Sequence, residues 1–211
     1  MTCRKRNLAC WTLANGKCNV AAVSEPSDIE QAVKAAIGRW IDEVVVGMRL
    51  CPFAAGPWKA GEVRIAVSAA TNAEDAVKDA LDEAMHLMEV SEDEVGTTLV
   101  AFPSALADFE TFLDAEETLA AILDQAGCEG ILQVASFHPD YVFADAEEGD
   151  IGNWTNRAPV PILHILREVQ VTQAVDQHPD SESIPAENVR RLEALGKEAI
   201  LRLWRTCAVT S

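Results

Sequence analysis

The sequence is poor in positive charge and contains few aromatic residues. Its 211 residues include 17 lysines and arginines against 34 aspartates and glutamates, so the formal net charge is −17. Nucleic-acid binding relies on a basic surface, and the deficit therefore argues against a nucleic-acid partner. Docking on an anionic membrane is disfavoured for the same reason. No apolar run approaches the ~20 residues that a transmembrane helix needs.

The cysteines lack the spacing of a metal site. The sequence contains no CxxC pair, and Cys51, Cys128 and Cys207 lie far apart. Such usage is typical of free thiols in a reducing compartment. We therefore expect an intracellular protein, cytoplasmic or, if it carries a transit peptide, organellar. No motif identifies a cofactor, and none indicates an oligomeric state.

The few basic residues are unevenly placed. Residues 1–24 contain four lysines and arginines and no acid, so they carry +4, and the rest of the chain carries −21. A basic leader without acids is typical of an organelle transit peptide, and a disordered tail is the alternative. At ~150 residues per domain, the length fits one domain. We expect a leader over residues 1–26 and a single α/β domain over residues 27–211.

Apolar periodicity predicts alternating helices and strands from residue 27 onward. Helices are expected over residues 27–47, beginning with a capping box at Ser27 and Glu30, and over residues 108–126. Another helix is expected to begin at a second capping box, formed by Thr71 and Glu74. Strands are expected over residues 62–68, 97–103 and 130–137. This βαβαβ series predicts a small three-stranded sheet with parallel strands, flanked by helices. A ferredoxin-like antiparallel sheet is the alternative.

The remainder of the chain is predicted to be a long loop followed by helices. Residues 138–158 have no hydrophobic period, and a loop of this length in a compact domain is usually functional or disordered. Helices are predicted to begin at Pro161 and at Pro185, which gives a helical C-terminal segment.

Cys51 is the first candidate for chemistry. It lies in the segment Leu50-Cys51-Pro52-Phe53, directly after a predicted helix. A thiol held in a rigid turn can be a nucleophile if a positive neighbour such as Arg49 lowers its pKa. The alternative is a buried core cysteine between Leu50 and Phe53.

His138 and Asp140 form the second candidate. They follow the third predicted strand, at the sheet edge where α/β proteins bind ligands. In an extended segment both side chains project to one side, as a base with its orienting carboxylate or as two metal ligands. The alternative is a turn after Pro139 in which both residues are structural.

A positive cluster is the third candidate. Asn156 and Arg157 precede a predicted helix in which His164 and Arg167 are three residues apart and would share one face. In an acidic protein, two arginines and a histidine suggest a pocket for phosphate or carboxylate. Structural ion pairs with the many carboxylates are the alternative.

Several of these segments resemble the family called domain of unknown function 1415. The resemblance covers about residues 28–200 and rests most on residues 50–54 (LCPFA), 130–141 (GILQVASFHPDY) and 155–159 (TNRAP). The first 24 residues lie outside it. It implies a shared fold unit, and it supplies no mechanism because the family has no established activity.

We therefore expect an enzyme acting on a small anionic, phosphate- or carboxylate-bearing metabolite. Cys51 or His138 would perform the chemistry, with Asp140 orienting His138 and His164 as a second acid or base. Asn156, Arg157 and Arg167 would bind the anion. One alternative is a metal site formed by His138, Asp140 and His164, a two-histidine, one-carboxylate set. The other is a non-catalytic binding module whose partner surface is the loop over residues 138–158.

Overall fold

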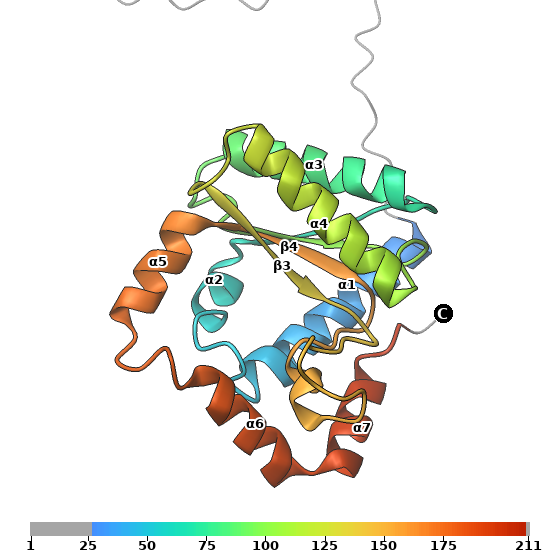
Figure 1. Cartoon of the computed structure of the whole chain (residues 1–211), viewed down its shortest axis with the longest axis vertical. Helices are drawn as coiled ribbons and strands as arrows, with labels where there is room; N and C mark the ends of the chain where they lie inside the picture. The colour runs from blue at the N-terminus through green and yellow to red at the C-terminus, as the bar shows by residue number, and fades with distance from the viewer. Residues whose placement is uncertain (1–26, 210–211) are drawn as a thin grey trace, which may run out of the picture.

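The fold is mixed α/β, with a four-stranded sheet covered by helices on both faces. A computed structural model describes residues 27–209, and the predicted leader lies outside these residues. In Figure 1, α3 (Ala73–Glu89) and α4 (Phe109–Gln125) lie together on one face of the sheet, and α1 (Asp28–Trp40) lies on the other. Within the described residues, no helix is long and apolar enough to cross a membrane.

The sheet corrects the predicted three parallel strands. Its order is β1 (Val63–Val67), β2 (Thr97–Ala101), β4 (Ile162–Arg167), β3 (Leu132–Phe137). β1 pairs parallel with β2, whereas β4 lies between β2 and β3 and pairs antiparallel with both. The parallel pair also distinguishes this sheet from the ferredoxin-like alternative.

The segment that forms β4 was predicted to be a helix. Its six residues, ILHILR, form a short apolar run, which does not distinguish a strand from a buried helix by periodicity. Backbone groups on β2 and β3 provide hydrogen-bond partners along both edges of this segment, so the sheet decides its conformation.

The capping residues explain where the long helices begin. Ser27 Oγ accepts a hydrogen bond from the Glu30 N–H at 3.1 Å, as the predicted capping box requires. Asp108 caps α4 by accepting from the Thr111 N–H at 2.9 Å. The cap of α3 is Asn72, not the predicted Thr71, because Asn72 Oδ1 accepts from the Asp75 N–H at 2.9 Å.

The first predicted helix is interrupted before Gly47. α1 gives way to the π-helical segment η1 (Ile41–Val46), and a short helix, α2 (Ala55–Ala60), follows after a turn. The long loop contains the 3₁₀ turn η2 (Ile151–Thr155). The last predicted helix is two helices, α6 (Ile184–Leu195) and α7 (Lys197–Thr206), separated by Gly196 with φ +79°. α5 (Glu168–Gln177) directly follows β4.

Two apolar cores lie on opposite faces of the sheet. The core beneath α3 and α4 contains Phe102, Phe112 and Ile165. The core beneath α1 contains Trp40 and Ile162, which are far apart in the sequence. Because neighbouring β4 residues point to opposite faces, Ile162 and Ile165 belong to different cores.

Candidate functional site

A tightly built turn presents Cys51 at the end of η1. We call residues 47–54 the Cys51 turn. A Cβ at Gly47 would lie 2.5 Å from the carbonyl oxygen of Glu43, so this position takes glycine. Arg49 has φ +56°, a left-handed conformation that is uncommon for residues with a side chain. π-Helical turns and unusual backbone angles cluster at functional sites, which directs attention to Cys51.

Helix α6 holds this turn through two carbonyl groups. Asn188, which is 6% exposed, donates from Nδ2 to the Leu50 carbonyl oxygen at 2.7 Å. Arg191 donates to the Arg49 carbonyl oxygen at 2.8 Å and to Asn188 Oδ1 at 3.0 Å. The carbonyls of both residues that precede Cys51 are thus fixed by side chains from one distant helix.

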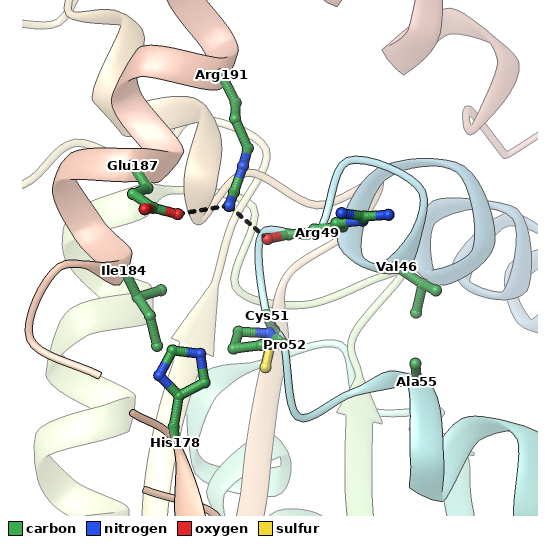
Figure 2. Close-up of a pocket in the computed structure, with 9 residues that line it drawn as sticks. All are labelled: Val46, Arg49, Cys51, Pro52, Ala55, His178, Ile184, Glu187 and Arg191. Carbon is green, nitrogen blue, oxygen red and sulfur yellow. Dashed lines mark hydrogen bonds and ion pairs between the residues drawn. The ribbon is translucent and has the colours of Figure 1, made fainter. Parts of the chain in front are cut away.

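Cys51 faces a cavity of about 340 Å³, which we call the Cys51 pocket (Figure 2). This volume is within the range of small-molecule sites. In Figure 2, the sulfur of Cys51 and the ring of His178 point into the same space, below Glu187 and Arg191 of α6. The pocket is lined by four apolar or proline residues and five others: Val46, Pro52, Ala55, Ile184, Arg49, Cys51, His178, Glu187 and Arg191.

The thiol of Cys51 is protonated at rest. Burial raises the pKa of Cys51, and hydrogen bonds from the backbone N–H groups of Phe53 and Ala54 act in the opposite direction. Those two N–H groups favour negative charge on the sulfur once the proton has left. Arg49 is not among the groups that shift this pKa, so the expected lowering of the Cys51 pKa by a positive neighbour does not occur.

His178 presents a hydrogen-bond donor to the pocket. The Asp180 N–H donates to Nδ1 of His178 at 3.2 Å, so the proton of the neutral ring is assigned to Nε2. The ring packs edge-on against Phe53 with centroids 5.7 Å apart. No residue within 27–209 accepts from Nε2, and this N–H is available to a ligand.

The pocket is more positive than the protein around it. Two arginines and one glutamate line it, in a chain of net charge −17. Glu187 pairs with Arg191 at 2.6 Å, which leaves one formal positive charge uncompensated among the lining residues. An anionic ligand is therefore better matched here than a cationic one.

His138 lies in a different environment, under α4. It is 0% exposed, and its ring packs against Phe109 and Phe112 with centroids 5.2 and 5.0 Å apart. Nδ1 accepts from the Asp140 N–H at 3.0 Å, and Nε2 consequently donates to the Leu106 carbonyl oxygen at 3.0 Å. Asp140 thus orients His138 through its backbone rather than its carboxylate. Burial lowers the pKa of His138, which favours the neutral ring.

Asn156 and Arg157 adjoin His138 and are held by backbone groups. The His138 N–H donates to the Asn156 carbonyl oxygen at 3.1 Å, and Asn156 Nδ2 donates to the Ser136 carbonyl oxygen at 3.2 Å. Arg157 donates to the carbonyl oxygens of Tyr141 and Glu148, both at 3.3 Å, and its guanidinium stacks on Trp154. These three predicted residues are together, but none lines the Cys51 pocket.

His164 and Arg167 do not share the predicted helical face. In a strand, residues three apart point to opposite faces. His164 Nε2 donates to Thr97 Oγ1 at 2.7 Å, because the Thr97 hydroxyl itself donates to the Ile165 carbonyl oxygen. Arg167 donates to three carbonyl oxygens at the end of α3 and just beyond it, those of Leu87, Val90 and Val95.

Arg157 and Arg167 also lie at opposite ends of the β3–β4 pair. Arg167 is opposite Leu132, where β3 begins, whereas Arg157 adjoins His138, just after β3 ends. From Leu132 to His138 the chain advances six residues, which corresponds to about 20 Å in a strand. Arg157 and Arg167 are therefore too far apart to bind one small anion together, contrary to the expectation from the sequence.

The predicted metal triad is also corrected. His138 packs against α4, whereas His164 faces the opposite core, where its ring lies 6.2 Å from that of Phe137. The sheet separates the two imidazoles. Across residues 27–209, no three His, Cys, Asp or Glu side chains are grouped closely enough to hold a metal ion.

His178 was not among the candidate residues that the sequence indicated. A signal was present, because His178-Pro179-Asp180 repeats the tripeptide His138-Pro139-Asp140. Both copies form the same turn, in which the Asp N–H donates to the His Nδ1. We call them the His138 turn and the His178 turn. The contribution of Asn188 has no comparable signal, because it depends on a contact across 138 residues.

With the geometry established, comparison with known proteins identifies the family. The sequence profile described as "Protein of unknown function (DUF1415)" matches residues 32–202. The chain belongs to the DUF1415 family. Searches of curated proteins and of solved structures give no match. The region matched to DUF1415 includes the Cys51 turn, both His-Pro-Asp turns and Asn188, so the whole site lies within the family unit.

Proposed function

We propose that this DUF1415 protein is an enzyme that binds a small anionic molecule in the Cys51 pocket and attacks it with the Cys51 thiol. The observation that carries the proposal is the cavity in which the Cys51 sulfur and the His178 ring face the same space. Support also comes from the local positive charge and from the construction of the Cys51 turn. The predicted nucleophile is retained, and His178 takes the place proposed earlier for His138.

The proposed chemistry is nucleophilic substitution at an electrophilic carbon, such as that of an activated carboxyl group. The Cys51 sulfur forms a bond to that carbon, the bond to the leaving group breaks, and the thiol proton moves to the departing group. Water then attacks the same carbon, which releases the acid and restores the thiol. The Nε2–H of His178 donates to the oxygen that gains negative charge, and the N–H groups of Phe53 and Ala54 stabilise the thiolate.

The first test measures binding. Thermal unfolding of the full chain is recorded with phosphate monoesters, thioesters and small carboxylic acids. A ligand at 100 times its Kd adds about 2.7 kcal/mol of stability. The ligand should also slow iodoacetamide labelling of Cys51, measured peptide by peptide by mass spectrometry, because it covers the sulfur.

The variants separate the roles of the two residues. His178→Gln keeps an N–H donor, so it should bind the ligand nearly as wild type, whereas His178→Ala should weaken binding by about tenfold or more. Cys51→Ser should retain binding and lose turnover. The proposal is wrong if no anion stabilises the protein, or if Cys51 is labelled no faster than the buried Cys128 and Cys207.

A further inference from the structure

A second concave surface lies on the other side of the molecule, far from the chemistry proposed above. The seam between the first half of α3 and most of α4 contains a groove of about 500 Å³. In Figure 1 these two helices form the outermost layer, and no other element within residues 27–209 covers them. We call this surface the α3–α4 groove. Its lining is mainly apolar along the floor and polar at the rim: Ala73, Val77, Leu81, Ala115, Ile122, Glu74, Lys78, Thr111, Asp114 and Thr118.

The floor of the groove is about as long as a three-turn helix. Its α4 residues run from Thr111 to Ile122, which corresponds to about three turns or 16 Å. Leu81 and Ile122 are only partly buried, although both are large apolar side chains. Met85, one turn beyond Leu81, is also apolar and is 45% exposed. The groove therefore offers an apolar strip that matches the face of a short helix.

The surrounding charge is of one sign. α3 contains six acids and one lysine, and α4 contains five acids and neither lysine nor arginine. Lys78 is paired with Asp82 at 3.3 Å, so it does not make the rim basic. Glu74 and Asp114 remain at the rim as exposed carboxylates without an ion-pair partner in residues 27–209.

We propose that the α3–α4 groove binds a basic amphipathic helix of a partner protein. Apolar side chains spaced i, i+3 or i+4, and i+7 would fill the floor, and lysines or arginines on the flanks would face Glu74 and Asp114. Charge complementarity selects this occupant, because an acidic or neutral helix would gain nothing from the rim. The inference is independent of the Cys51 pocket.

The test uses the full chain and two labelled synthetic peptides of about three turns. One peptide has leucines at i, i+3, i+4 and i+7 with lysines elsewhere, and the other replaces every lysine by glutamate. Fluorescence anisotropy should detect binding of the lysine peptide only. Leu81→Gln and Ile122→Gln should each weaken it by about tenfold, whereas Val169→Gln, an exposed apolar position on α5, should not change it.

A second pair of variants tests the rim without disturbing the core. Glu74→Gln and Asp114→Asn are exposed and should fold normally, yet they should weaken binding and reduce its salt dependence. Asp176→Asn on α5 removes the same charge outside the groove and should have no effect. Equal losses in all three variants would overturn the proposal, because they would indicate general attraction to an acidic protein.

Other occupants give distinct results. A photo-crosslinking residue at position 118 should capture the added lysine peptide. Capture of residues 1–24 of the same chain, or of a second copy, would overturn the proposal of a partner protein and identify the basic leader or a dimer as the occupant instead.

Discussion

The two His-Pro-Asp turns show how one tripeptide can have two different surroundings. In both turns the Asp N–H fixes the histidine Nδ1 as an acceptor. The His138 turn is buried, and its Nε2–H is used by the Leu106 carbonyl oxygen. The His178 turn is partly exposed, and its ring faces the Cys51 pocket. The tripeptide determines the histidine tautomer. The surrounding fold determines whether the Nε2–H donates to a buried carbonyl oxygen or faces a pocket.

The difference between the two turns is tested most strongly by replacing each histidine with alanine. His138→Ala leaves a cavity beside Phe109 and Phe112 and deprives the Leu106 carbonyl and the Asp140 N–H of their partner. We expect it to lower the free energy of unfolding by about 4 kcal/mol. His178→Ala should cost about 1 kcal/mol or less. Urea unfolding measures both, and equal losses would show that the two turns are equivalent.

Acidification tests a further buried histidine, His164, whose surroundings favour the neutral ring. Burial lowers the pKa of His164 to about 4, below the ~6.5 of an unfolded chain. As the pH falls from 6.5 to 4, the unfolded state binds the proton first, so stability is lost across this window, by about 3 kcal/mol for this residue.

The matched variant is His164→Gln, whose amide can still donate to Thr97. Its unfolding free energy should depend less on pH between 6.5 and 4 than that of the wild type. An unchanged pH profile would show that other groups govern acid stability. His138, whose pKa burial also lowers, should contribute in the same direction.

A smaller effect than those of His138 and His164 is expected for the scaffold of the Cys51 pocket. Asn188→Ala removes the bond to the Leu50 carbonyl oxygen and should lower stability by about 1–2 kcal/mol. It should also speed iodoacetamide labelling of Cys51, because the Cys51 turn is no longer held by α6. Asn188→Asp keeps the shape without the donor and should behave similarly. A destabilised variant with wild-type labelling of Cys51 would limit Asn188 to a purely structural role.

Local signals predicted much of the fold. The Ser27 and Asp108 caps, the apolar strands and the helices between them depend on residues close in sequence. β4 could not be predicted in the same way, because Ile162–Arg167 is short and its conformation is decided by strands 30 to 65 residues earlier in the chain. The helix break at Gly196 was also not predicted, because an apolar stripe continues on both sides of this glycine.

The candidate site could be predicted only in part. Cys51 was found because its turn is encoded locally by Gly47, Leu50 and Pro52. Its partners on α6 come from the far end of the chain, and no spacing rule connects them to position 51. Arg157 and Arg167 were singled out because the protein has few positive residues. Both arginines donate to backbone carbonyl oxygens, and the composition cannot indicate such contacts.

The position of β4 has a consequence for how the protein is made. β2 and β3 touch only through β4, which is synthesised last of the four strands. A nascent chain that ends before Ile162 therefore exposes one edge of β2 and both edges of β3, and neither core is closed. Such edges promote pairing between chains. The ribosome must release β4 before this domain can complete its sheet, so folding of the sheet is a late event in its synthesis.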